Sequence, residues 1–198
     1  MKRYKFDQND SVPNFIGSWI IEPPTLCVDI KNFYDSHKEK QKQGRVSQGK
    51  IDRSIKDSTD ISIEPRNISS SDNNAFKIYL NELSDCYKDY ANQWPFLKEY
   101  YQSVDVGIFN LQRYESGQHF NKIHTERSFE HMEREFAFMT YLNEGMEGGS
   151  TYFQHYDLEI KPVQGLTLIW PAAWTHAHKG NIVKTGTKYI ITGWLDLH

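Results

Sequence analysis

One short stretch of the chain, RYESGQHFNKIHTERS, holds a histidine and a carboxylate two residues apart, His124 and Glu126. Successive side chains of a β-strand point to opposite faces of the sheet, so a strand here would place both groups on one face. An imidazole and a carboxylate on one face supply two ligands of a metal site, or else form an ordinary polar patch. A third ligand is needed to distinguish the two.

Candidate third ligands lie downstream. They are His131, His155, His176, His178 and His198. The stretch WPAAWTHAHKGNIVKTGTKYIITGW gives a strand-like context to His176 and His178 only, and these two are again two residues apart. Both would face the same way on an extended backbone, and spacing alone does not choose between them.

The elements that would carry these residues are strands. After residue 104 the hydrophobic pattern alternates with a period of two, which predicts β-strands separated by Gly-rich or charged turns such as NEGMEGGS and KTGT. The predicted strand segments are 106–114, 135–143, 150–154, 158–162, 166–171 and 188–197. Many short strands at this spacing favour a sandwich or a barrel. Runs such as FAFMTYL are apolar on both faces, so we expect one face inside the β-structure and the other under helices.

The first half of the chain predicts the helical support, over about 25–100. Residues 18–21 (SWII) could form a short strand before Pro23-Pro24, and a helix is predicted from Thr25 to about Gln43, ended by Gly44. Polar residues dominate 44–62, whose end alternates toward a strand. A stronger helix is predicted over 71–100, with a Ser/Asp cap and with Pro95 kinking or splitting it. Its apolar face comprises Phe76, Leu80, Leu83, Tyr87, Ala91 and Trp94.

Composition limits the class of protein. The 198 residues are 38% hydrophobic and 14% aromatic, with a net charge of −3, which suits one mainly β domain (1–198, core about 104–198). The charge gives no argument for binding nucleic acid or an anionic membrane. No run approaches a membrane span, and the N-terminus lacks the apolar core of a signal peptide. Cys27 and Cys86 fit no zinc motif and are expected as reduced thiols, so we expect a cytoplasmic protein.

Three blocks together carry a family resemblance: RY-x-x-GQ-x-F-x-x-x-HTE, EFAFMTYLNE-x-x-x-GGSTYF and WPAAWTHAHKGN-x-V-x-x-GTKYIITGW. In this order they resemble the Fe(II)- and 2-oxoglutarate-dependent oxygenases, in particular the compact microbial and phage-type members of the prolyl-4-hydroxylase-like branch. The resemblance covers about residues 105–195 well and 45–65 faintly. It implies a double-stranded β-helix, or jelly roll, with flanking helices, in agreement with the strand pattern.

The resemblance implies a ligand set for Fe(II): His124, Glu126 and His178. It selects His178 over His176 because HKGN fits the family pattern around the distal histidine. Aspartate is the commoner middle ligand, and this chain has glutamate. Two imidazoles and one carboxylate on one face of Fe(II) leave positions open for the 2-oxo acid and O2. Ascorbate is the expected reductant.

The resemblance also implies cosubstrate and substrate residues. Lys188 matches the basic residue that binds the far carboxylate of 2-oxoglutarate, Tyr114 matches a tyrosine that donates to it, and Thr151 is a further candidate donor. Arg127 is expected either to meet an acidic group of the substrate or to form a surface salt bridge. Trp194 is expected either on the substrate side or in the core.

The implied activity is hydroxylation of an unactivated C–H bond, with release of succinate and CO2. Within the branch, a prolyl residue of a peptide or protein is the substrate by analogy, and a small molecule is the other class. The alternative is a catalytically silent jelly roll that binds a ligand or protein. A hydrolytic zinc enzyme ranks last, because the chain has no HExxH helix. Substrate choice is expected in the loops 44–62 and 127–135, the second a candidate lid.

Overall fold

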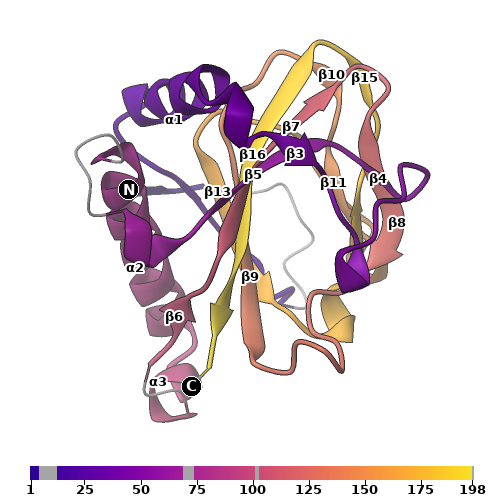
Figure 1. Ribbon diagram of the computed structural model, residues 1–198. Coiled ribbons are helices and arrows are strands. Elements are labelled where there is room, and N and C mark those ends of the chain that lie inside the picture. The colour runs from indigo at the N-terminus through magenta and orange to yellow at the C-terminus, as the bar shows by residue number, and fades with distance from the viewer. Residues whose placement is uncertain (5–12, 69–73, 101–102, 198) are drawn as a thin grey trace.

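A computed structural model describes residues 1–4, 13–68, 74–100 and 103–197. In it, helices cover one side of a large antiparallel sheet, and a smaller sheet lies on the other side (Figure 1). The fold is mainly β with a jelly-roll core, as the sequence predicts. No helix within these ranges is long and apolar enough to cross a membrane.

The large sheet runs through the middle of the molecule. Within the described residues it has nine strands, in the spatial order β1 (Lys2–Arg3), β2 (Gly17–Ile20), β13 (Leu166–Pro171), β9 (Arg134–Tyr141), β16 (Thr187–Asp196), β7 (Phe109–Glu115), β5 (Thr59–Ile63) and β3 (Lys42–Gln43), with β6 (Asp105–Val106) paired to β16. The strands β2, β3 and β5 show that the first part of the chain contributes sheet edges as well as helices.

The small sheet faces the large one. Its strands, in spatial order, are β12 (Leu158–Ile160), β11 (Thr151–Phe153), β14 (His178–Gly180), β8 (His119–His124) and β4 (Lys56–Asp57). A separate pair joins β10 (Glu147–Gly148) to β15 (Val183–Thr185). The predicted strand list omitted β8, β10, β14 and β15, because polar residues, glycines and the metal-ligand motifs interrupt their hydrophobic alternation.

Two helices pack on the outer face of the large sheet. The chain forms α1 (Thr25–Ser36), α2 (Asn74–Gln93) and α3 (Phe96–Tyr100), with short 3₁₀ turns at Lys38–Lys40, Ser47–Gly49, Pro65–Asn67, Gln154–Tyr156 and Trp174–His176. The predicted split at Pro95 is confirmed. The expected cap before α2 lies outside the described residues. The prediction that the first helix reaches Gln43 is wrong: His37 has a non-helical backbone, and Gln43 pairs with Thr59 in the sheet.

Alternation along the central strands separates two hydrophobic clusters. On β9, Phe136 and Phe138 pack with the helices, whereas Ala137, Met139 and Tyr141 pack toward the small sheet. This confirms the expectation that FAFMTYL is buried on both faces. The buried face of α2 consists of Phe76, Tyr79, Leu83, Cys86, Tyr90 and Ala91, a face slightly rotated from the predicted one.

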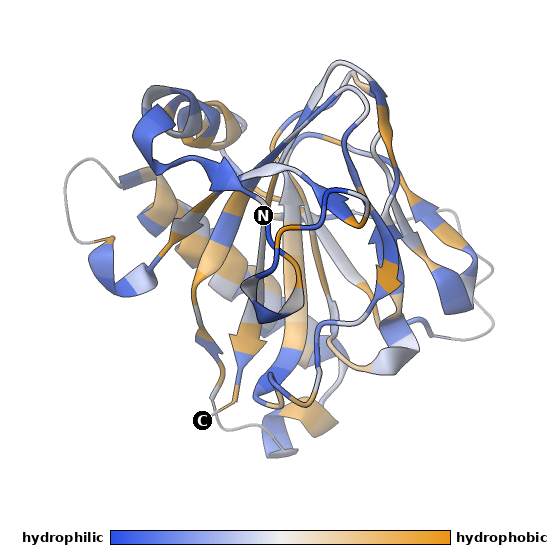
Figure 2. Ribbon diagram, turned by 45° about the vertical axis from the view of Figure 1, so that its right-hand side comes forward, coloured by the Kyte–Doolittle hydropathy of each residue, from blue (hydrophilic) through white to orange (hydrophobic). Residues whose placement is uncertain are grey.

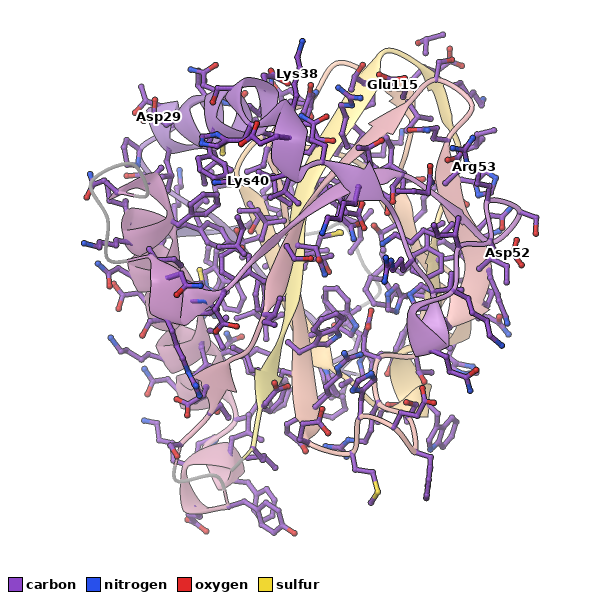
Figure 3. All side chains as sticks on the ribbon, viewed as in Figure 1. Asp29, Lys38, Lys40, Asp52, Arg53 and Glu115 are labelled. Atoms are coloured by element: carbon purple, nitrogen blue, oxygen red, sulfur yellow. The ribbon has the colours of Figure 1, made fainter. Side chains whose placement is uncertain are left out.

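Hydropathy follows the same arrangement. Hydrophobic and hydrophilic positions alternate along the central strands and the helices (Figure 2). The charged side chains labelled in Figure 3, among them Asp29, Lys38, Arg53 and Glu115, project outward from the edges of the fold. Among the described residues, Lys56, Asp60 and Lys188 are buried, and Lys188, the most buried cation of these, lies between the sheets.

Candidate metal centre

Two histidines meet across the small sheet. His124 ends β8, His178 begins β14, and the two residues are direct partners in the antiparallel register. Glu126 lies just beyond β8, in a bend rather than on the strand as the spacing argument assumed. The bend still turns its carboxylate back: one ligand atom from each of the three residues lies within 4.8 Å of the others.

Backbone carbonyls orient both imidazoles. Nδ1 of His124 lies 2.9 Å from the carbonyl oxygen of Lys122, and Nδ1 of His178 lies 2.9 Å from that of His176. A carbonyl only accepts, so each Nδ1 carries the donated proton. Each Nε2 then faces the carboxylate: Oε1 of Glu126 lies 3.6 Å from Nε2 of His124 and 3.4 Å from that of His178. Hydrogen bonds of this kind fix the tautomer and the ring orientation of a metal-binding histidine.

The carboxylate of Glu126 is held in its charged form. Burial alone would raise its pKa, but the neighbouring His124 and His178 hold the pKa well below its usual range. Its second oxygen, Oε2, accepts a hydrogen bond of 2.7 Å from Nε1 of Trp194. Trp194 comes from β16 of the large sheet, so the two sheets meet at this one carboxylate.

A cavity of about 380 Å³ opens between the sheets around these groups. The candidate residues that line it are Tyr114, His124, Glu126, Thr151, His178, Lys188 and Trp194. Met139, Trp170 and Ile190 add apolar wall, and Arg45, Lys122 and His131 lie toward the loops. The cavity thus brings together every predicted site residue except Arg127.

Lys188 is the buried cation of this cavity. Its side chain is 2% exposed, and Nζ donates to the carbonyl oxygen of Gly149 at 3.0 Å and lies 4.5 Å from the centre of the Tyr114 ring. No carboxylate pairs with it among the described residues. Burial lowers its pKa from 10.5 to about 7. An anionic ligand would remove this penalty, because it would supply the missing countercharge.

Tyr114 and Thr151 stand beside the lysine. Tyr114 is the register partner of Lys188, and its hydroxyl donates to Oε1 of Gln112 at 2.8 Å. The Thr151 hydroxyl lies 2.7 Å from that of Tyr141, either of which can donate. Gln112 was not predicted, although its spacing of two from Tyr114 places it on the same strand face. Tyr141 was also not predicted as a site residue, because its position in the apolar run FAFMTYL indicates a core residue.

Arg127 points away from the cavity. Its guanidinium pairs with Glu135, and its Nε donates to the carbonyl oxygen of Arg134 at 2.7 Å. Of the two expected roles, the structure shows the salt bridge. His176 is buried, and its Nε2 lies 2.8 Å from the carbonyl oxygen of Asn14. Its ring therefore contacts the backbone of another segment and does not line the cavity.

The residues present fit the implied metal and cosubstrate. Two neutral imidazole nitrogens and a carboxylate oxygen are the donor set that suits non-haem Fe(II), and they leave the cavity side open. A buried lysine without a countercharge lies in the same cavity. In addition, the indole N–H of Trp170, which lines the cavity, is buried without a hydrogen-bond partner in the described part of the chain. Unsatisfied donors of this kind suit a carboxylate ligand.

Comparison with known families agrees with this site. Residues 109–196 match the model of the 2OG-Fe(II) oxygenase superfamily. Over this region the chain is similar to that superfamily. The matched range contains the two histidines, Glu126 and Lys188. It confirms the predicted class, a 2-oxoglutarate-dependent dioxygenase, and with it Fe(II), 2-oxoglutarate and O2 as the cofactor and cosubstrates of the family. No curated protein matches the chain in sequence.

Solved structures share the fold at low identity. A Pseudomonas putida prolyl-4-hydroxylase is 18% identical, with a TM-score of 0.70 over 92% of each chain. A prolyl hydroxylase from Trichoplax adhaerens, in complex with a hypoxia-inducible factor peptide, has a TM-score of 0.74 at 16% identity, over 92% of this chain and 84% of that one. A viral collagen prolyl hydroxylase from Paramecium bursaria Chlorella virus-1, in complex with 2-oxoglutarate, has a TM-score of 0.64 at 16% identity, over 93% and 97%.

Proposed function

We propose that this protein hydroxylates an unactivated C–H bond of a peptide or protein, with a prolyl residue as the first substrate to test. The observation that carries the proposal is one cavity that holds a His-Glu-His cluster and a buried lysine with no carboxylate partner among the residues that the structure describes. The solved prolyl hydroxylases of the same fold, one with a bound peptide, support the choice of substrate class.

In this proposal the two histidines of the small sheet and the nearby Glu126 hold the metal, and Lys188 of the large sheet is the main group that holds the cosubstrate. His124, Glu126 and His178 would hold Fe(II), with Nε2 of each histidine facing Oε1 of the glutamate. Lys188 pairs with the far carboxylate of 2-oxoglutarate, with the Tyr114 and Thr151 hydroxyls as additional donors. When bound, Fe(II) with 2-oxoglutarate and O2 supplies the oxidising power for hydroxylation, and succinate and CO2 are the co-products.

The chain's own groups prepare the reaction. The Nδ1–carbonyl hydrogen bonds keep each histidine in the tautomer that offers Nε2. The buried site of Lys188 strengthens its attraction for a carboxylate, because water does not screen the pair there. Apolar wall from Met139, Trp170 and Ile190 excludes water from the space between them.

Substrate reaches the cavity past two loops, which include Arg45 and Gln48 on one side and Ser128 and His131 on the other. Both lie in the segments where the sequence predicts substrate choice. Phe129 and Met132, in the second loop, are 93% and 69% exposed and offer apolar contact to a peptide.

We also propose ascorbate as the reductant and a reducing, cytoplasmic setting, in line with the free thiols of Cys27 and Cys86.

The test is substrate-stimulated turnover. Protein loaded with Fe(II), and supplied with ascorbate, 2-oxoglutarate and O2, is expected to release succinate slowly alone and faster with a proline-containing peptide. Mass spectrometry of that peptide should show a gain of one oxygen atom. Succinate release without peptide oxidation, across a panel that also includes free amino acids, would support the oxygenase activity and contradict the prolyl substrate. No succinate from any mixture would favour the silent jelly roll.

A further inference from the structure

We propose that Trp194 is a positioning residue that fixes the carboxylate of Glu126 for metal binding through one oxygen. The inference rests on the proposed metal centre and adds to it the residue that orients the acidic ligand. It concerns a feature of this chain, namely that the acidic ligand is a glutamate and that an indole N–H lies within its reach.

The two carboxylate oxygens of Glu126 have separate partners. Oε1 faces Nε2 of both histidines, at 3.6 Å and 3.4 Å, while Oε2 accepts the Trp194 N–H at 2.7 Å. A glutamate has one more rotatable bond than an aspartate, so an untethered carboxylate would lose more freedom on binding a metal. The hydrogen bond from the Trp194 indole restricts the rotation of the carboxylate before a metal binds. It leaves only Oε1 facing the metal position.

Trp194 is itself held in place. It lies on β16 opposite Ala137 of β9, in the middle of the large sheet. The Arg134 guanidinium lies 3.5 Å from the centre of its ring, and Nη1 of Arg134 donates to the backbone oxygen of Glu126 at 3.2 Å. Arg134 therefore contacts both the tryptophan ring and the backbone of the ligand that the tryptophan orients, which makes the arrangement rigid at both ends.

The length of the side chain makes this contact particular to glutamate. An aspartate at position 126 would be shorter by one methylene, roughly 1.5 Å of reach. Its carboxylate would not extend from the same backbone position to the histidines and to Trp194 together. The proposal therefore predicts an energetic coupling between Glu126 and the indole N–H that disappears when the acid is shortened.

A double-mutant cycle on Co(II) affinity tests this coupling. Wild type, Trp194→Phe, Glu126→Asp and the double variant are titrated with Co(II) alone by calorimetry, and the visible absorption of the bound Co(II) is recorded. Phenylalanine keeps a ring for Arg134 but removes the N–H. We expect Trp194→Phe to weaken Co(II) binding by about tenfold, in the range found for outer-sphere partners, and to alter the Co(II) spectrum.

In the Glu126→Asp background, the same Trp194→Phe change is expected to alter Co(II) affinity by less than about twofold. Trp174→Phe is the matched control, since Trp174 is 72% exposed and lies outside the cavity. Thermal unfolding of the apo-proteins checks that each variant folds. Wild-type Co(II) affinity in Trp194→Phe, or an equal loss in both backgrounds, would overturn the positioning role while the metal centre stands. Wild type without stoichiometric Co(II) binding would overturn the metal centre and this inference with it.

Discussion

The two sheets that face each other across the cavity are built differently. The large sheet has long strands, β9 and β16 among them, with a hydrophobic cluster and helices on its outer face. The small sheet consists mostly of two- and three-residue strands, and its longest strand, β8, is half-buried or exposed along its length. Lys188 and Tyr114, the main proposed cosubstrate groups, lie on the large sheet, and the two histidines lie on the small one, together with Thr151.

The difference shows where each task draws its support. Lys188 can be kept buried beside Tyr114 because long, well-packed strands hold it there. The histidines sit on short strands that packing alone stabilises less, so we expect a bound metal to contribute to the order of the small sheet. Substitutions on the two sides should therefore affect different equilibria, and the predictions below run from the largest expected effect to the smallest.

Loss of a histidine should abolish metal binding. His178→Ala removes one of three ligands, so stoichiometric binding of Mn(II) or Co(II) in calorimetry is expected to disappear while the apo-protein still folds. His176→Ala is the matched control, because this neighbouring histidine contacts the backbone of Asn14 instead of the cavity. Metal retained in the His178 variant and lost in the His176 variant would reverse the assignment.

Loss of Lys188 should weaken 2-oxoglutarate and spare the metal. Lys188→Ala removes a charge-assisted contact of about 1.5–3 kcal/mol, so 2-oxoglutarate affinity of the metal-loaded protein should fall roughly tenfold or more. Metal affinity, on the other sheet, should change little. Lys188→Arg is expected to restore binding in part, since the larger guanidinium must fit the same space. Equal 2-oxoglutarate affinity in wild type and Lys188→Ala would contradict the role given to this lysine.

The same lysine should make the apo-protein's stability depend on pH. Its pKa is about 7 when folded and 10.5 ordinarily, so between these values the unfolded chain binds more protons. Stability should therefore rise with pH through this window, and the full penalty of the buried charge should be present below pH 7. Lys188→Met lacks that penalty. Its gain in melting temperature over wild type should be largest near pH 7 and shrink toward pH 10, and a constant difference would argue against the shift.

Metal should protect the small sheet more than the large one. In hydrogen exchange of wild type with and without Mn(II), we expect slower exchange for the amides of β8 and β14 and little change for β9 and β16. At a metal concentration of 100 times Kd, the stabilisation of the whole fold is about 2.7 kcal/mol. Uniform protection of both sheets would show that the two do not differ in this respect.

The sequence predicts the large sheet better than the small one. β9, β13 and β16 are long and apolar on a period of two, which local pattern detects. β8 is polar and β14 has only three residues, and their place in the fold comes from pairing with each other and with β4 and β11. The division of the chain into a single domain, and the roles of the individual site residues, stay predictions.

Within the site, the family resemblance selects the two histidines, Glu126 and Lys188 as candidates, whereas contacts between distant segments are not visible in the motifs. Arg134 stacks on Trp194 across 60 residues of chain, and Gln112 accepts from Tyr114 while also reaching Asp60. Such contacts depend on register between strands, which a single sequence does not encode in its local pattern. The sequence left two roles open for Arg127, and its salt bridge with Glu135 is likewise a contact that the local pattern does not encode.

The direct pairing of His124 with His178 has a consequence for folding accuracy. A slip of one residue between β8 and β14 would turn one imidazole to the other face of the sheet. Short polar strands specify their alignment weakly, so misaligned pairings would cost little in packing. Only the native alignment presents both nitrogens to a single ion. A metal that binds early in folding would thus stabilise the native strand register selectively. Chains that fold without it would contain a larger share of misaligned sheets.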